Sequence, residues 1–244
     1  MKSLVAGLAL LSGAASAEEY GLRIDVDLSV RTMFPSDQQL VAWVITTLSD
    51  ANGEFHAGNV QLYINDLVLR DADYPGAITQ KLDAYRLATQ DVSGIRMLFT
   101  ALHQNAPTGA GVAVRDGLCV GEPVVVVSVP TQPAIRDYRA VELTIHEINH
   151  LFALDHSHCT SPPIDMCWSG PAPSCYTGPT SCPTNPEDAT VMSLCFNGAC
   201  APQLNSWRIH PVQVEQLINS RCRCLFKDGF EVQPKSSTLI EYVE

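Results

Sequence analysis

The stretch that decides the fold of this chain is HEINHLFALDH, residues 146–156. In a helix, residues four apart lie on the same face, so His146 and His150 can bind one metal ion. Glu147, the next residue along, points at a water molecule on that ion rather than at the metal. His156 follows His150 by six residues and supplies a third imidazole. Three imidazoles leave an open position on zinc, whereas a structural zinc site is closed by four protein ligands. The stretch therefore predicts a catalytic zinc site.

The chemistry that this site predicts is the hydrolysis of peptide bonds. Bound zinc lowers the pKa of its water to about 7 and polarises a carbonyl group, and amide hydrolysis needs both effects. Glu147 is the predicted general base, which takes a proton from the water and passes it to the leaving amine. A bare HExxH pattern also occurs by chance in solvated helices. The third histidine, the apolar residues at 151–154 and the segment Val191-Met192-Ser193 favour the zinc interpretation.

The third ligand has one competitor, His158, which lies two residues beyond His156. The position of His156 lets the chain leave the helix and fold back beneath the metal. Two more residues would add roughly 6 Å of extended chain that must be looped out. We therefore predict that His156 is the ligand and that His158 is a loop histidine.

The first residues have the pattern of a secretion signal, residues 1–17. Lys2 supplies the positive charge, residues 4–11 are apolar, and Ala15-Ser16-Ala17 is an A-x-A cleavage site. No later apolar run approaches the roughly 18 residues that are needed to span a bilayer. We expect a mature chain that is secreted, extracellular and soluble.

The charge of the chain bears on its partners. The 244 residues carry a formal net charge of −11, and removing Lys2 with the signal takes this to −12. Such a charge argues against nucleic acid and anionic membrane as partners. We expect a monomer that acts on protein or peptide substrates. An acidic surface also suits structural calcium, but no calcium-loop spacing is present.

Nine cysteines indicate an oxidising compartment, and eight of them follow the zinc motif. In an exported chain they predict a disulfide framework that clamps a loop-rich C-terminal half. A second zinc site made of cysteines is the alternative, but the spacings are irregular and CxxC is absent. Because nine is odd, one thiol is free or paired between molecules. The cysteines are Cys119, Cys159, Cys167, Cys175, Cys182, Cys195, Cys200, Cys222 and Cys224.

The periodicity of apolar residues predicts strands that alternate with helices before the zinc motif. A helix should begin at Ser36, whose side chain caps it, with Gln39 completing a capping box. The zinc helix should run from Tyr138 to about Ala153. One domain is expected at residues 18–226, with an upper part at 18–153, a lower cysteine-rich part at 154–226, and an uninterpreted tail at 227–244. The other expected elements are strands at 20–28, 60–65 and 124–127, a helix around 78–85 and a last helix at 211–220.

At these residues the chain resembles the metzincin clan of zinc peptidases, whose signature is HExxHxxGxxH followed by a Met-turn. Within the clan it is most similar to the reprolysin/adamalysin group, over most of the mature chain. The resemblance implies an α+β fold of the α/β/α type. Its twisted, mostly parallel sheet has an antiparallel edge strand, and a long zinc-binding helix and a disulfide-rich irregular C-terminal subdomain follow. Met192 would form the Met-turn, a hydrophobic floor beneath the zinc.

The resemblance also implies a substrate-binding strand. Residues 111–119 look like the edge strand of the group and the cysteine that follows it. A peptide substrate would lie antiparallel to this strand, which is an instance of β-augmentation. Adamalysin-type structures tie the cysteine after the strand to one near the C-terminus, which implies a bond from Cys119 to Cys222 or Cys224. The implied substrate-binding residues are Gly111, Val112, Ala113 and Val114.

Three departures from the group are visible. Ala153 stands where the family has a helix-ending glycine, and a positive φ at a non-glycine residue costs roughly 1 kcal/mol. Ser157 follows the third histidine where adamalysins have Asp, which is more like matrixins. Leu194 stands two residues after Met192, so the tyrosine ligand of astacins and serralysins is missing. No prodomain is expected between the signal and the first strand.

The sequence thus predicts a secreted zinc-dependent metalloendopeptidase with one catalytic zinc ion. The alternative is a secreted disulfide-rich zinc-binding module, or a toxin-like protein, without proteolytic activity. A closed structural site would need a fourth protein ligand, and the intact Glu147 argues against a peptidase that has lost its activity.

Overall fold

The computed structural model describes residues 17–101, 110–164, 190–193, 208–220 and, for the backbone alone, 239–243. The predicted secretion signal up to residue 16 and most of the cysteine-rich stretch lie outside these residues. Cys222 and Cys224, the predicted partners of Cys119, also lie outside them.

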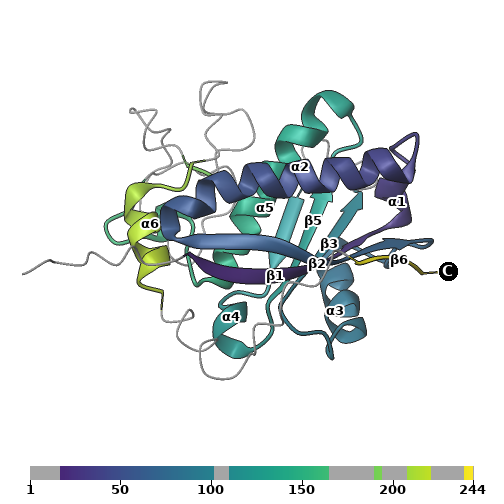
Figure 1. Cartoon of the computed structure of the whole chain (residues 1–244). Coiled ribbons are helices and arrows are strands. Elements are labelled where there is room, and N and C mark those ends of the chain that lie inside the picture. Colours follow the sequence, from purple (N-terminus) through teal and green to yellow (C-terminus); the bar gives the residue numbers. More distant parts are fainter. Residues whose placement is uncertain (1–16, 102–109, 165–189, 194–207, 221–238, 244) are drawn as a thin grey trace, which may run out of the picture.

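Within the described residues, six strands form one sheet in the order β4-β5-β3-β1-β2-β6 (Figure 1). β4 pairs antiparallel with β5, and every other neighbouring pair is parallel. The mostly parallel sheet with an antiparallel edge strand confirms the predicted α+β fold. The strands are β1 (Glu18–Val26), β2 (Val60–Arg70), β3 (Ile95–Ala101), β4 (Ala110–Ala113), β5 (Val124–Val129) and β6 (Leu239–Val243).

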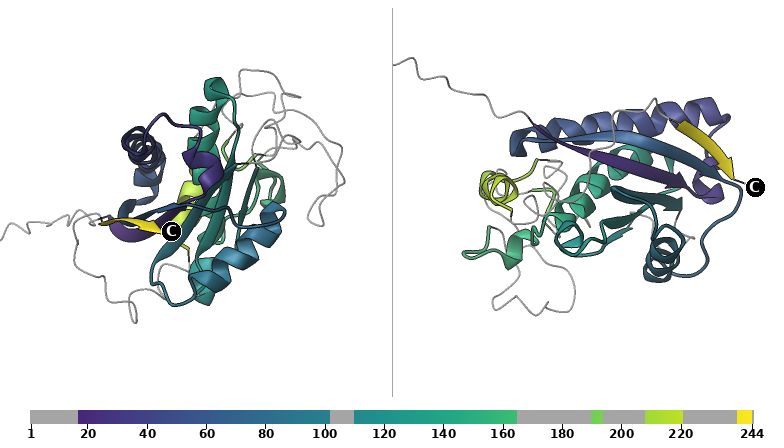
Figure 2. Two further views of the ribbon diagram at one scale, coloured as in Figure 1. Left: turned by 90° about the vertical axis from the view of Figure 1, so that its right-hand side faces the viewer. Right: turned by 60° about the horizontal axis from the view of Figure 1, so that its bottom comes forward.

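Helices cover both faces of the sheet, as Figures 1 and 2 show. α2 and α5 pack against each other on one face, and α3 packs on the other face against β4 and β5. Among the described helices none is long and apolar enough to cross a membrane. The helices are α1 (Leu28–Arg31), α2 (Asp37–Phe55), α3 (Ile78–Ala88), α4 (Gly117–Val120), α5 (Pro133–Leu151) and α6 (Pro211–Ile218), with 3-10 turns η1 (His56–Gly58) and η2 (Ser157–Cys159).

The residues of β5 suit a sheet that is covered by helices on both faces. All six residues of the strand are buried, because a parallel sheet with helices on both faces has no solvent side. Val125 and Val127 belong to the large core that α2 and α5 share. Val124 and Val126 belong to a smaller core beneath α3. Successive valines therefore fill the two layers in turn, as the two-residue period of a strand requires.

Two helix starts follow from local chemistry. The side chain of Ser36 accepts a hydrogen bond from the backbone N–H of Gln39 at 3.3 Å, so α2 begins where its cap predicts. α5 begins at Pro133 rather than at the predicted Tyr138. Proline at the first helical position has the φ angle that a helix needs and lacks only an N–H that would have no partner there. The zinc motif consequently lies at the end of a 19-residue helix.

Three features of the sheet differ from the prediction. β3 was not expected, yet it lies between β1 and β5 and all seven of its residues are buried. β2 continues to Arg70, beyond the predicted end at residue 65. The tail at 227–244 contains β6, which runs parallel to the last part of β2. These pairings depend on partners that are distant in sequence.

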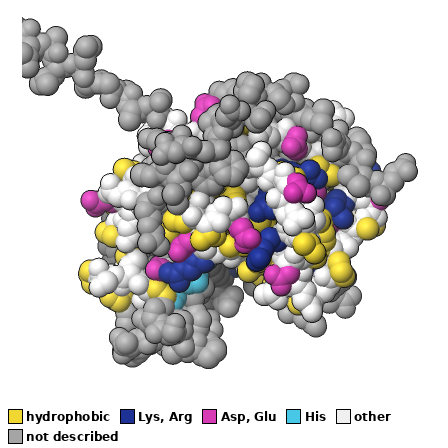
Figure 3. All heavy atoms as spheres, turned by 90° about the horizontal axis from the view of Figure 1, so that it is seen from below, with side chains coloured by type: hydrophobic (Ala, Val, Ile, Leu, Met, Phe, Trp, Pro, Cys, Tyr) yellow, Lys and Arg dark blue, Asp and Glu magenta, His cyan; other side chains and the backbone are white. Residues whose placement is uncertain are grey.

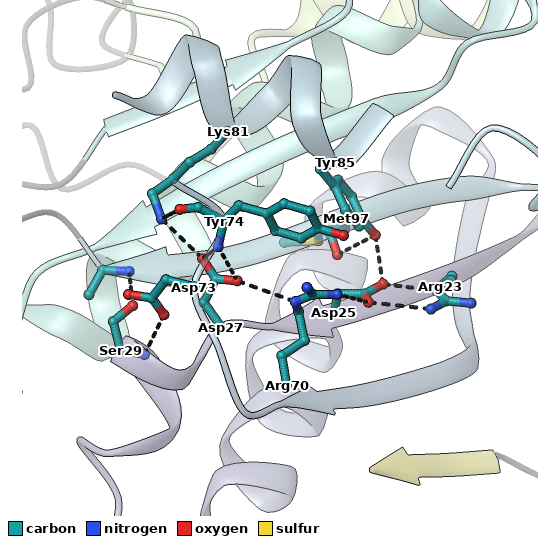
Figure 4. A network of polar contacts seen from close by, with 11 residues as sticks. Arg23, Asp25, Asp27, Ser29, Arg70, Asp73, Tyr74, Lys81, Tyr85 and Met97 are labelled. Atoms are coloured by element: carbon teal, nitrogen blue, oxygen red, sulfur yellow. Dashed lines mark hydrogen bonds and ion pairs between the residues drawn. The ribbon is translucent and has the colours of Figure 1, made fainter. Parts of the chain in front are cut away.

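A buried network of charged side chains fixes α3 to the carboxyl ends of β1 and β2 (Figure 4). The Asp25 carboxylate accepts hydrogen bonds from Tyr85 and Arg23, both at 2.9 Å. The Asp27 carboxylate accepts one from Lys81 of α3 at 3.2 Å. Burial raises the pKa of Asp27 above its usual value. Breaking such a pair would leave a buried charge without compensation, so the network holds α3 in place.

Candidate active site

Three histidine nitrogens meet at the end of α5. His146 and His150 lie on the last turns of the helix, one turn apart. The chain then reverses, and His156 returns to the same point. The three Nε2 atoms are each 3.2 Å from the other two, so they form an equilateral triangle. The structure thus brings together the three residues that the sequence spacing selected.

The hydrogen bonds on the far side of two rings fix which nitrogen is free. The Nδ1 of His146 donates to the carbonyl oxygen of Val191 at 2.7 Å, and the Nδ1 of His150 donates to that of Leu154 at 2.8 Å. A carbonyl only accepts, so in the neutral rings of His146 and His150 the proton is on Nδ1 and the Nε2 lone pairs of these two rings face the triangle. Lone pairs that converge without a proton between them need a cation.

The triangle has the size that zinc requires. In a tetrahedral site with zinc–nitrogen distances of about 2.0–2.1 Å, neighbouring nitrogen atoms lie about 3.3 Å apart. The observed separation of 3.2 Å matches this value. The three-histidine group therefore fits a zinc site with one position left open.

The surroundings keep the three histidines neutral, which is the form that binds metal. Burial, and then the neighbouring histidines, lower the pKa of His146 well below its usual value. The same causes lower the pKa of His156 to about 3. Burial also lowers the pKa of His150. At neutral pH protons therefore do not compete with a metal ion for the nitrogen atoms of these rings.

Ala153 makes the turn that carries the chain to His156. Its φ angle is 67°, in the left-handed region that favours glycine. Its N–H bonds to the carbonyl of His150 at 3.1 Å, and the next N–H, that of Leu154, bonds to the carbonyl of Asn149 at 3.2 Å. This pair of bonds is the Schellman motif that ends many helices. An alanine therefore takes the position and conformation of the helix-ending glycine.

His158 is placed differently from the three histidines. It is buried, and its ring stacks on that of His156 with centroids 5.4 Å apart. Its ligand atoms also come close to those of His156 and Cys159. Cys159 is disulfide-bonded, however, so it offers no thiolate to a metal at this second group.

Glu147 lies against the edge strand. It is 5% exposed, and burial raises the pKa of its carboxyl group to about 8. A Cβ atom added to Gly111 of β4 would lie 2.3 Å from Oε1 of Glu147, so the backbone of the strand touches the carboxylate. A carboxylate in such a setting is a stronger base than one in water, as a group that accepts a proton near neutral pH should be.

The predicted substrate-binding residues lie on the described edge strand and just beyond it. Gly111, Val112 and Ala113 pair with β5, and Val114 follows with its N–H bonded to the carbonyl of Val124 at 2.9 Å. β4 stands at the end of the strand order, so among the described strands none pairs with its outer edge. Gly111 of this edge strand lies against Glu147.

A family comparison agrees with this geometry. A reprolysin model of metallo-peptidase family M12 matches residues 16–207, which is most of the chain. The chain belongs to metallo-peptidase family M12. It is thus a metallopeptidase, a hydrolase acting on peptide bonds, and the predicted reprolysin resemblance is confirmed. None of the curated proteins matches the chain.

In this M12 peptidase, Met192 lies in a buried segment, residues 190–193, that contacts His146 and Ser157. The carbonyl of Val191 accepts the hydrogen bond from His146. The carbonyl of Met192 accepts one from the N–H of Ser157, next to His156, at 3.0 Å. Met192, the predicted Met-turn residue, therefore contacts the segment that carries His156.

Charged residues lie near His150 and His156. His150 and His156 are only half-buried. Arg115, just after the edge strand, forms an ion pair with Asp155, the residue before His156. Figure 3 shows histidine reaching the surface beside basic and acidic side chains.

The sequence did not predict three polar residues from other elements that form hydrogen bonds with the segment around His156. They are Thr190, Gln213 and Ser220. One of them leaves a trace in the sequence. Gln213 lies four residues before the buried Leu217 on α6, so a polar residue takes a position on the apolar face of the helix.

Proposed function

We propose that this M12 peptidase is a secreted zinc endopeptidase in which His146, His150 and His156 hold the metal and Glu147 is the general base. The observation that carries the proposal is the triangle of Nε2 atoms at 3.2 Å, with the lone pairs of His146 and His150 directed inward. The buried carboxyl group of Glu147 on the same helix supplies the proton acceptor.

The proposed reaction divides the work between the metal and Glu147. Zinc held by the three histidines would lower the pKa of a water molecule and polarise the scissile carbonyl group. Glu147 accepts a proton as the water oxygen bonds to the carbonyl carbon. It then delivers that proton to the amide nitrogen as the carbon–nitrogen bond breaks. The products are a carboxylic acid and an amine, and Glu147 is regenerated.

Substrate is proposed to bind as an added strand on β4. The outer edge of β4 offers backbone N–H and C=O groups to an extended peptide, and such pairing gives affinity without demanding a particular sequence. Gly111 of this strand lies directly against Glu147. A peptide that pairs with residues 111–114 would thus pass the general base with its backbone. Protein substrates follow from the family.

Secretion is proposed from the N-terminal pattern at residues 1–17. The structure offers a second support, since Cys119 and Cys159 are both disulfide-bonded. Disulfides persist in oxidising compartments and are rare in the cytosol. The bond from Cys119 to Cys222 or Cys224 and the role of Met192 as the floor of the site belong to the same proposal.

The test is cleavage of a proteome-derived peptide library by the purified protein. Cleavage should stop with a zinc chelator and return when zinc is added back in excess. Cleavage that continues in the chelator would contradict zinc catalysis. Stoichiometric zinc without any cleavage would favour the non-proteolytic binding module instead.

A further inference from the structure

The loop at residues 152–155 joins the second and third histidines and contains the strained turn. Ala153 adopts a φ angle of 67°, which costs a residue with a Cβ atom roughly 1 kcal/mol. Glycine, the usual residue at this position of a Schellman motif, would bear no such cost. A change of Ala153 to a negative φ would therefore relieve this strain. The same change would alter the path of the chain that leads to His156.

Helix α6 holds the loop at both ends. The Nε2 of Gln213 donates to the carbonyl oxygen of Asp155 at 2.9 Å. The Oγ of Ser220, just after the helix, donates to the carbonyl oxygen of Phe152 at 2.8 Å. The two acceptors lie on either side of Ala153 and Leu154, so the bonds bracket the strained turn.

Gln213 also joins the loop to the Met192 segment. Its side chain is fully buried, and its Oε1 accepts a weak hydrogen bond from Thr190 Oγ1 at 3.5 Å. That hydroxyl lies 2.9 Å from Oγ of Ser157, the residue after His156. One side chain from α6 thus links the residues on both sides of the third histidine, through a carbonyl on one side and two hydroxyls on the other.

Leu154 is buried in the main core and Ala153 packs against that core, but a pocket also lies between the loop and α6. Ala153 and Leu154 line a cavity of about 250 Å³ with Gln216 and Ser220 on its other side. The hydrogen bonds from Gln213 and Ser220 bridge the loop to α6 beside this pocket.

We propose that Gln213 and Ser220 are positioning residues that keep the loop at 152–155 in the conformation that carries His156 to the metal. They offset the strain at Ala153, where glycine would need no such support. The inference rests on the proposed zinc site, but it does not require that the protein cleave peptides.

The experiment measures the rate of zinc loss from the purified, zinc-loaded protein into an excess of a chromogenic chelator. Gln213→Leu keeps the size of the side chain and removes both hydrogen bonds, and Ser220→Ala removes the other. Each should speed zinc loss by about tenfold, since removing a partner that orients a ligand typically weakens metal binding by about 10- to 100-fold. Gln216→Leu, the same change at an exposed position of α6, should stay within about twofold of the parent.

A second change separates positioning from general damage to the fold. Ala153→Gly removes the strain, so adding it to Gln213→Leu should restore most of the lost zinc retention. Because relief of the strain at Ala153 also stabilises the fold in general, the thermal stability of each variant is measured beside its rate of zinc loss. Zinc retention that recovers by more than the change in stability accounts for supports a positioning role. Far-ultraviolet circular dichroism confirms that each variant is folded.

Three outcomes overturn the proposal. Gln213→Leu and Ser220→Ala could lose zinc no faster than Gln216→Leu. Ala153→Gly could fail to restore zinc retention in the Gln213→Leu protein. A parent that binds no zinc would refute the proposed zinc site itself, and this measurement on the parent is made first.

Discussion

A single methyl group at Gly111 should remove most of the activity of this M12 peptidase. In the Gly111→Ala variant the new Cβ would lie 2.3 Å from Oε1, 2.5 Å from Cγ and 2.6 Å from Cδ of Glu147. Ordinary van der Waals contact begins at 3.4 Å, so the carboxylate must retreat by about 1 Å (3.4 minus 2.3). A displacement of about 1 Å at a catalytic group can cost about 100-fold in rate. We expect kcat to fall by about that factor.

The assay combines kinetics with thermal unfolding of four proteins: the parent, Gly111→Ala, Glu147→Ala and the double variant. Zinc content should not change in Gly111→Ala, because the contacts of the new methyl group are with Glu147. Overpacking should destabilise the protein by about 1–3 kcal/mol when Glu147 is present. The cost should largely vanish in the Glu147→Ala background, where the methyl group has room. A parent-like kcat, or an equal loss of stability in both backgrounds, would show that Gly111 and Glu147 are not in contact.

Three further predictions concern the ligands, the disulfides and pH. In zinc titrations His156→Ala should lower affinity by orders of magnitude, and His158→Ala should leave it within about a few-fold; the reverse order would show that the ligand assignment is wrong. Peptide mapping without reduction should find Cys119 bonded to Cys222 or Cys224, and any other state of Cys119 would contradict the implied pairing. The metal-free protein should lose stability as the pH falls from 6.5 toward 3, because burial lowers the pKa of folded His156 to about 3 and the unfolded state then binds more protons. Urea unfolding at pH 7 and pH 4.5 measures this, and equal stabilities would count against it.

The elements that the sequence predicted are those whose signals are local. Ser36 caps α2 through a residue three positions away, and the zinc ligands on α5 are one helical turn apart. The run of β-branched valines in β5 predicts a strand without any information about its partner strands. Each of these patterns falls within a single element, so no knowledge of the partner was needed.

β3 escaped prediction because polar residues interrupt its apolar run. Arg96 and Thr100 are both buried in the strand. Arg96 is accommodated because its guanidinium donates to the carbonyl of Thr89 at 2.8 Å, a partner outside the strand. β6 was not predicted because its place in the sheet depends on β2, a partner far away in sequence. Contacts of this kind become visible only when the chain is folded.

The residues of the site also fall into those that local sequence patterns predicted and those whose contacts form only in the folded chain. The spacing of the motif predicted which histidines meet, and the resemblance identified the edge strand. Neither shows that Gly111 touches Glu147, or that Gln213 reaches Asp155 across 58 residues. Ala153 was recognised as a costly substitution for glycine, and its φ angle of 67° confirms that the strain is present. How the strain is borne depends on α6, which the motif does not include.

The most direct test of the account is Glu147→Ala, studied for zinc and for turnover in the same preparation. Glu147 is proposed to move protons and not to bind metal, so the variant should hold about one zinc per chain, as the parent does, and lose nearly all turnover. The zinc content is measured by atomic absorption and the turnover with a peptide that the parent cleaves. Hydrolysis at the rate of the parent would contradict the role of Glu147. Loss of zinc together with activity would contradict the separation of metal binding from proton transfer on which the account depends.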